Sequence, residues 1–188
     1  MSQRRLAGGQ PKPLTKERAW NYLLYILARR SYTVAELREK LLRRGLPAAE
    51  AEPLLQRLHE LRLVDDSTFA EQYVSSRKRA RGRLVLRREL QRKGVAEELV
   101  ERELEALSPE QQARAATELL QKNAWRYRPQ SDQTQAGQEA SEAASHARRE
   151  QLLKARSKAF AFLARRGYTA EAAQQALQRT GWFEDHDD

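Results

Sequence analysis

A short basic segment, residues 77–93, contains most of the side chains in this sequence that could bind another molecule. It has nine lysines and arginines and a single acid, Glu89, so its surplus of +8 compares with a net charge of +9 for all 188 residues. Its cations are Arg77, Lys78, Arg79, Arg81, Arg83, Arg87, Arg88, Arg92 and Lys93. Mutual repulsion among them costs stability unless an anion relieves it, and basic faces of this kind often bind nucleic acid. We therefore predict that the segment binds a polyanionic partner.

The same segment has the apolar spacing of a folded helix. Leu86, Leu90 and Val95 recur on one helical face, whereas the arginines between them point elsewhere. Basic pairs also precede a glycine at three places: Arg43 and Arg44, Arg92 and Lys93, Arg165 and Arg166. A cation in the last helical turn offsets the helix dipole by up to about 1 kcal/mol, which explains one pair per helix but not the whole segment. We predict that all these cations contribute to partner or DNA binding.

Signs of enzymatic chemistry are absent from the sequence. His59, His146 and His186 have no metal-binding motif around them, and the chain has neither of the glycine-rich motifs that bind nucleotide phosphates. Asp65 and Asp66 directly precede a predicted helix, where carboxylates cap the helix and interact with its dipole. We therefore predict that the protein is not an enzyme and that it has no cofactor and no metal site.

Three aromatic residues near the N-terminus could stack on nucleic-acid bases. Trp20 shares a helical face with Leu23 and Leu27, a spacing that favours a place in the core. Tyr22 and Tyr25 lie on less crowded faces of the same predicted helix. These two tyrosines therefore stay open as stacking candidates.

Composition limits the class of protein. Eight glycines and six prolines leave few interruptions, and the dominant residues are helix formers. Cysteine is absent, which excludes disulfides and thiolate chemistry and fits a reducing compartment. No apolar run approaches the ~20 residues of a membrane span, and the N-terminus has no hydrophobic signal core. We expect a soluble, cytoplasmic, all-α protein that is a monomer and has no membrane partner.

Local signals predict the helix boundaries in the first part of the chain. An apolar stripe predicts a helix over residues 15–30, with a basic pair in its last turn. Thr33 and Glu36 form a capping box that starts a second helix, which ends at Gly45. A third helix has an apolar face that runs to Leu61, and Pro53 predicts either a kink or a start near residue 52.

The pattern then recurs. Asp65 or Asp66 starts a helix that we expect to reach about residue 80, and Gly82 separates it from a basic helix that ends at Lys93. Ser108 begins a further helix with proline at its first position and glutamine three residues after the cap.

Aligning the three glycines at the ends of the predicted middle helices, Gly45, Gly94 and Gly167, reveals an internal repeat. The sequence therefore predicts three tandem three-helix repeats. We assign them to residues 14–63, 64–107 and 108–181, the second being the most basic. A basic arm at residues 1–13, a polar insertion at residues 128–147 in the third repeat and an acidic tail at residues 182–188 complete the predicted organisation.

Four segments, in this order, resemble the RecX family of bacterial regulators of the RecA recombinase. They are Glu36-Leu37-Arg38-x-Lys40-Leu41-x-x-Arg44-Gly45, Asp65-Asp66-x-x-Phe69-Ala70-x-x-Tyr73-Val74-x-x-Arg77, Gly82-x-x-x-Leu86-x-x-Glu89-Leu90-x-x-Lys93-Gly94-Val95 and Phe162-Leu163-x-Arg165-Arg166-Gly167-Tyr168. The resemblance covers roughly residues 19–181.

The resemblance implies an elongated, curved array of three-helix repeats that lies in the groove of the RecA filament on single-stranded DNA. Relatives mainly inhibit filament growth, ATP hydrolysis, strand exchange in homologous recombination and the coprotease activity that triggers the SOS response to DNA damage. One alternative is a stand-alone basic helical protein that acts by competition for DNA. Two questions stay open: how recombinase and DNA share the contacts, and whether double-stranded DNA also binds.

Overall fold

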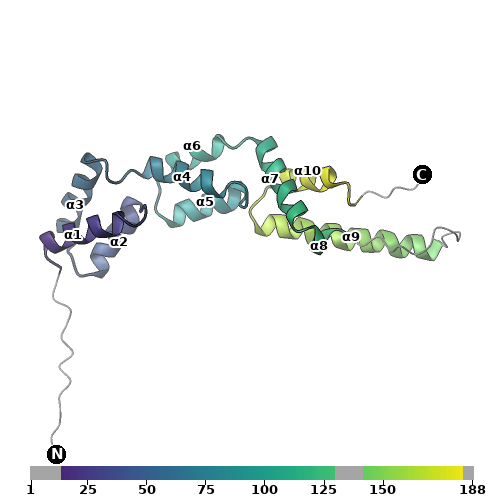
Figure 1. The fold of residues 1–188 in the computed structure, drawn as a ribbon, viewed down its shortest axis with the longest axis horizontal. Helices are drawn as coiled ribbons and strands as arrows, with labels where there is room; N and C mark the ends of the chain where they lie inside the picture. The colour runs from purple at the N-terminus through teal and green to yellow at the C-terminus, as the bar shows by residue number, and fades with distance from the viewer. Residues whose placement is uncertain (1–13, 130–141, 184–188) are drawn as a thin grey trace, which may run out of the picture. The chain divides into compact units, whose positions relative to one another are not determined.

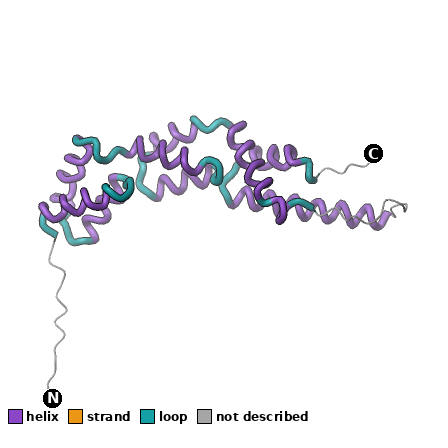
Figure 2. Tube along the Cα trace, viewed as in Figure 1, coloured by secondary structure: helices purple, strands orange, loops and turns teal. Residues whose placement is uncertain are grey.

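The computed structural model describes residues 14–129 and 142–183, which form α-helices and no strand (Figures 1 and 2). The predicted all-α class and helical repeat array are confirmed. The predicted arm at residues 1–13 lies outside the described residues, as do residues 130–141 of the insertion and residues 184–188 of the tail. The helices are α1 (Lys16–Leu27), α2 (Val34–Arg43), α3 (Ala48–Glu60), α4 (Asp66–Arg77), α5 (Arg83–Arg92), α6 (Glu97–Glu105), α7 (Pro109–Lys122), α8 (Ala124–Tyr127), α9 (Glu142–Arg165) and α10 (Ala170–Thr180).

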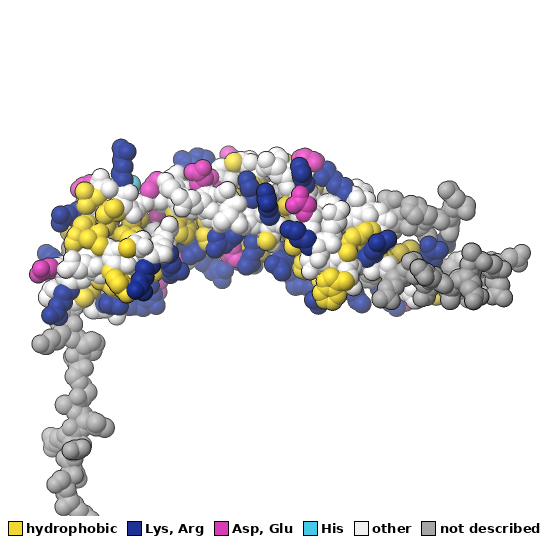
Figure 3. Space-filling view, viewed as in Figure 1, with side chains coloured by type: hydrophobic (Ala, Val, Ile, Leu, Met, Phe, Trp, Pro, Cys, Tyr) yellow, Lys and Arg dark blue, Asp and Glu magenta, His cyan; other side chains and the backbone are white. Residues whose placement is uncertain are grey.

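The chain forms two compact units. Unit 1 comprises residues up to Phe69 together with Lys93–Ala96, and unit 2 comprises Ala70–Arg92 and the residues from Glu97 onward. The core of unit 1 is made by α1, α2 and α3, with Leu23, Leu37, Leu41 and Leu58 fully buried. Lysines and arginines are spread over much of the visible surface, with fewer acids between them (Figure 3).

Unit 2 contains a cluster of buried residues from α7, α8, α9 and α10. The four-residue helix α8 was not predicted; it begins after Asn123, whose side-chain amide donates to the carbonyl of Leu119 at 2.8 Å. The helix brings Tyr127 into this cluster, where its ring stacks on Phe162 at 4.8 Å. Leu86 and Leu90 of α5 are also fully buried, as the apolar spacing of that helix predicts.

Two capping boxes predicted from the sequence are present. The Thr33 hydroxyl accepts from the backbone N–H of Glu36 at 3.1 Å, and the Glu36 carboxylate accepts from the N–H of Thr33 at 3.3 Å. Ser108 and Gln111 make the same reciprocal pair at the start of α7. Side-chain oxygens thus satisfy N–H groups that have no partner inside the helix.

Two expectations for α3 are wrong: a start near residue 52 and a place for Leu61 on the apolar face. The helix begins at Ala48 and continues through Pro53, because the Pro47 carbonyl accepts from the N–H of Ala51, whose side chain is fully buried. Leu61 is 53% exposed and does not belong to the apolar face. It is the C-cap, and the chain leaves the helix at Arg62, where φ is +54°.

Two further helices end three residues earlier than predicted. α1 ends at Leu27, so its basic pair, Arg29 and Arg30, follows the helix and does not lie in its last turn. α4 ends at Arg77, where the carbonyl accepts from the N–H groups of Ala80 and Arg81 in a tighter turn.

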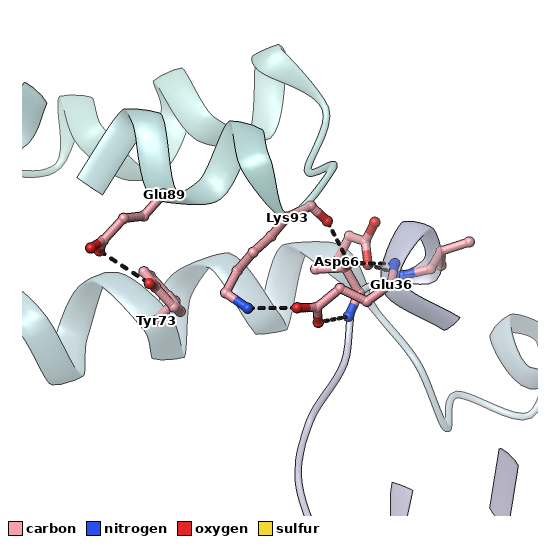
Figure 4. A network of polar contacts seen from close by, with 7 residues as sticks. Glu36, Asp66, Tyr73, Glu89 and Lys93 are labelled. Atoms are coloured by element: carbon pink, nitrogen blue, oxygen red, sulfur yellow. Dashed lines mark hydrogen bonds and ion pairs between the residues drawn. The ribbon is translucent and has the colours of Figure 1, made fainter. Parts of the chain in front are cut away.

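The first turn of α2 packs against Lys93 and Gly94, the residues that follow α5. The buried Thr33 hydroxyl donates to the carbonyl of Lys93 at 2.6 Å, and the Lys93 ammonium lies 2.6 Å from the Glu36 carboxylate (Figure 4). A Cβ atom on Gly94 would lie only 2.3 Å from that of Ala35, so only glycine fits this contact. All five residues belong to unit 1.

A similar contact occurs within unit 2, where the residues before α5 meet the turn after α9. The N–H of Gly82 donates to the carbonyl of Arg166 at 2.8 Å, and the N–H of Leu84 donates to the carbonyl of Gly167 at 3.0 Å. A Cβ atom on Gly82 would lie 2.2 Å from the backbone of Gly167. This contact fixes the start of the basic helix α5.

Replacing Thr33 with valine should test the first of these contacts. Valine has a similar shape but no hydroxyl, so it would leave the N–H of Glu36 and the carbonyl of Lys93 without this partner in a buried place. We expect the free energy of unfolding to fall by about 2–3 kcal/mol. Thr33→Ser keeps the hydroxyl and should lose much less. Chemical denaturation followed by circular dichroism measures both, and equal losses would refute the role of the hydroxyl.

Candidate anion-binding surface

Acidic side chains within unit 2 neutralise part of the basic segment. Arg87 bonds to the carboxylate of Glu101 on α6 at 2.6 Å, and Arg83 lies 3.5 Å from the same carboxylate. Arg81 lies 3.1 Å from Glu89, which is only 12% exposed. The repulsion inferred from sequence is therefore relieved in part by the protein itself. At least these three arginines have a structural role.

Arg77 is held by an aromatic ring. Its guanidinium lies 3.9 Å from the centre of the Tyr73 ring, and the Tyr73 hydroxyl donates to Glu89 at 3.1 Å (Figure 4). Burial, helped by this bond to Glu89, raises the pKa of Tyr73 above its usual value. The hydroxyl therefore keeps its proton and acts as a donor at neutral pH. Tyr73 thus links Arg77 to the Glu89–Arg81 ion pair.

Four cations of the segment remain available for a partner. Lys78 and Arg79 follow α4, and Arg88 and Arg92 lie on α5; all four are exposed. Among the residues described here, none of them has an ion-pair partner. We call these residues, together with the exposed and ring-stacked Arg77, the open cation set. Figure 3 shows basic side chains along the lower edge of the molecule, left of the centre of the view, in the part where Figure 1 labels α5.

The other predicted cations are not members of the open cation set. Lys93 belongs to unit 1 and pairs with Glu36. In the same unit, Arg43 lies 3.6 Å from Glu39 on an exposed surface, a pair of little energetic weight. Arg165 is exposed at the end of α9, whereas the Arg166 guanidinium lies 5.4 Å from the centre of the Phe162 ring.

Unit 1 has an aromatic surface that sequence reasoning left unresolved. Tyr25 is 56% exposed, and the guanidinium of Arg29 lies 4.2 Å from the centre of its ring. The guanidinium of Arg44 lies 3.7 Å from the ring of Tyr22 on the same helix. Tyr22 and Tyr25 are three residues apart on α1 and so share one helical face, which is the signal that could have identified the surface. Rings and guanidinium planes are the groups on which unpaired bases stack.

Asp66 has a different role from that of Asp65. Asp65 caps α4 by accepting from the N–H groups of Ser67 and Thr68, as predicted. Asp66 is half-buried and accepts from the N–H of Val34, the first residue of α2, at 2.9 Å (Figure 4). Burial raises the pKa of Asp66 above its ordinary value of 3.8, although the bond to Val34 acts in the opposite direction.

Replacing Asp66 with asparagine should change how stability depends on pH. The folded state disfavours the charged carboxylate and therefore favours the protonated form of Asp66. The contribution of Asp66 to the free energy of unfolding is complete below pH 3.8 and declines as the pH rises through the raised pKa. Asparagine can accept the Val34 bond without this loss. The free energy of unfolding of the Asp66→Asn variant, relative to that of the natural chain, should therefore increase between about pH 3 and pH 7. Denaturation at a series of pH values measures this, and a difference that does not vary with pH would contradict it.

Neither a metal site nor a membrane-spanning helix is found in the described part of the chain. No group of three or more histidine, aspartate or glutamate side chains there could hold a metal ion. No helix among residues 14–129 and 142–183 has the length and hydrophobicity that a membrane crossing requires.

Comparison with known proteins identifies relatives of two segments of the chain. Residues 19–58 match the family model of the RecX first three-helix domain, and residues 65–104 match that of the second. The regulatory protein RecX of Mycobacteroides abscessus is 42% identical over 91 residues, which are 47% of this chain and 45% of that protein. RecX of Mycolicibacterium smegmatis is 38% identical over 107 residues, or 56% and 57% of the two chains. The matches thus span about half the length of these relatives.

A solved structure shares the fold. The crystal structure of RecX from Lactobacillus salivarius superposes with a TM-score of 0.68 and covers 88% of this chain and 96% of that one. Its sequence identity of 20% makes this a likeness of fold alone.

Proposed function

Because this chain belongs to the RecX family, we propose that it regulates RecA-type recombinase filaments on single-stranded DNA. The proposed action is mainly inhibition of filament growth, of recombinase ATP hydrolysis, of strand exchange and of the coprotease step of the SOS response. It needs no covalent chemistry. A protein that binds adjoining protomers stabilises one state of the filament or blocks addition of the next protomer.

The open cation set is the observation that supports this proposal in the chain itself. Arg83 and Arg87 are paired with Glu101, so they are poorly placed to bind a partner without breaking an internal bond. Arg88 and Arg92 are exposed and have no such pairing among the described residues. A partner with negative charge, either acidic protein surface or DNA phosphate, would relieve their repulsion.

ATP turnover by preformed recombinase filaments tests the proposed function. The filament is assembled on saturated single-stranded DNA, and the protein is then added in amounts well below one per recombinase protomer. We expect turnover to fall at these low ratios, because one bound regulator affects the addition or the state of several protomers. Unchanged turnover at saturating protein would refute the proposal.

Direct binding to single-stranded DNA is a second candidate function, favoured by the aromatic surface of unit 1. Tyr25 and Arg29 offer an exposed ring and guanidinium to a base. A protein that acts only by competition for DNA should inhibit filament assembly on limiting DNA but should have no effect at low ratios on a filament already formed. The same ATP-turnover assay therefore separates the two functions.

A further inference from the structure

Unit 2 contains a pocket of about 380 Å³ next to the end of α4. Lys78 and Arg79 line it from the turn after α4, and Arg114 lines it from α7. Leu107 and Ala115 provide apolar wall, and both are more than nine-tenths buried. The pocket therefore combines three cations with apolar surface.

Gln112 contributes a buried polar group to this pocket. Its side chain is 4% exposed, and its amide oxygen accepts from the N–H of Arg83, the first residue of α5, at 2.9 Å. An N–H donor must face the oxygen of the amide, so this bond also fixes which end is the NH₂ group. Within the described residues that NH₂ group has no hydrogen-bond partner. Among the described residues, this nitrogen is not one of the fully buried atoms without a hydrogen bond, so it is open to solvent at the pocket and available to a ligand that accepts hydrogen bonds.

The charges of the residues that line the pocket favour the binding of an anion. Lys78 and Arg79 have no acidic partner among the described residues, and the acid of the pocket, Glu118, lies 3.3 Å from Arg114. The pocket lining thus has three cations and one acid, with amide N–H donors beside them. Such a lining suits the binding of an oxyanion.

We propose that this pocket binds a sugar–phosphate unit of single-stranded nucleic acid. A carboxylate would fill only a small part of about 380 Å³, whereas a ribose or deoxyribose ring can lie against Leu107 and Ala115 while its phosphate meets the cations. Arg77 is exposed next to Lys78 in the chain and offers a further cation to a neighbouring phosphate. The proposal rests on the proposed function, since it names the DNA contact of the same regulator.

Gln112→Glu separates the roles of the two ends of the amide. The carboxylate still accepts from the N–H of Arg83, so the start of α5 keeps its cap. It lacks the NH₂ donors and adds a negative charge to the pocket. Gln121→Glu, at an exposed position on the same helix and outside the pocket, is the matched control.

Binding of a fluorescent oligothymidylate to the full chain, without recombinase, tests the proposal. We expect Gln112→Glu to weaken binding about tenfold or more and Gln121→Glu to have little effect. Equal weakening by both variants would overturn the proposal that the pocket binds nucleic acid, because the affinity would then depend on net charge alone. Circular dichroism and thermal unfolding show whether each variant is folded.

Arg114→Gln provides a second test that does not depend on a buried side chain. Its side chain is 78% exposed, so the fold should tolerate the change. We expect the slope of log affinity against log salt to fall by about 1, as for one lost phosphate contact. An unchanged slope would count against the proposal.

Polyglutamate serves as the competing anion. If Gln112→Glu weakens polyglutamate binding and leaves oligothymidylate unaffected, the pocket binds acidic protein and the nucleic-acid assignment is wrong. Recombinase is absent from these binding assays, so a negative result would refute the pocket and would not refute the proposed regulation of the filament. Likewise, a negative ATP-turnover result would refute the regulation and would not refute the pocket.

Discussion

Gly82→Ala is expected to lower the free energy of unfolding by about 3 kcal/mol or more. The added methyl group would lie 2.2 Å from the carbonyl carbon and oxygen of Gly167 and from the N–H nitrogen of Tyr168. All three are backbone atoms, so no side chain can move aside to make room. Relief requires separating the residues before α5 from the turn after α9, which breaks the bonds from Gly82 and Leu84.

Gly45→Ala is the control for this prediction. Gly45 has a φ of +81°, but a Cβ atom there would meet nothing within 4 Å. The Gly45→Ala variant should therefore lose about 1–2 kcal/mol of the free energy of unfolding, and this loss comes from the backbone conformation alone. Gly82 is not in the left-handed region, so the stability lost in Gly82→Ala comes from the steric clash alone. Denaturant titration of both variants compares the two costs, and a smaller loss for Gly82→Ala than for Gly45→Ala would show that this contact does not support the fold.

The double variant Arg88→Glu and Arg92→Glu should raise the concentration needed for half-inhibition of recombinase ATP turnover by about tenfold or more. Both side chains are exposed on α5 and have no ion pair within the described chain, so the fold loses no internal bond. Reversal converts two attractive contacts into repulsive ones. We therefore expect lost inhibition with nearly unchanged thermal stability.

Lys122→Glu combined with Arg156→Glu makes a matched control for the change in net charge. Both positions are exposed in unit 2 and lie outside the basic segment. If inhibition depends on the open cation set, this control should inhibit nearly as well as the natural chain. Equal weakening by the two double variants would mean that total charge, and no particular surface, determines binding.

Arg87 behaves differently from its neighbour in this account. A reversal at Arg87 would place a carboxylate next to Glu101, with which Arg87 now pairs. Such a variant would lose stability as well as positive charge, so its effect on inhibition could not be assigned to a contact with the filament. Arg88 and Arg92 are the cleaner pair for that reason.

Local chemistry made much of the fold predictable. The capping boxes at Thr33 and Ser108 depend on side chains three residues apart, and both are present as expected. Glycine after a helix was also informative, since Gly45, Gly94 and Gly167 all have positive φ. The start near residue 52, one of the two alternatives that Pro53 suggested, is wrong because α3 begins at Ala48 and buries Ala51, a tertiary contact that no local pattern contains.

The candidate site was less predictable because its chemistry depends on distant partners. Charge counting predicts nine equivalent cations, whereas Glu101, fourteen residues from Arg87, determines that Arg83 and Arg87 are paired. The close approach of Gly82 to Gly167 and the bond from Arg83 to Gln112 likewise join residues far apart in the chain. Sequence reasoning identified the basic segment, and the structure adds which of its cations have internal partners.

Photo-crosslinking from position 88 tests the central claim most directly. A photoreactive residue is placed at Arg88, and in a second variant at Lys122, and each protein is irradiated with recombinase filaments on single-stranded DNA. The account predicts crosslinks to the recombinase or the DNA from position 88 and few from position 122. Crosslinks from position 122 with none from position 88 would contradict it, because the filament would then contact a surface other than the open cation set.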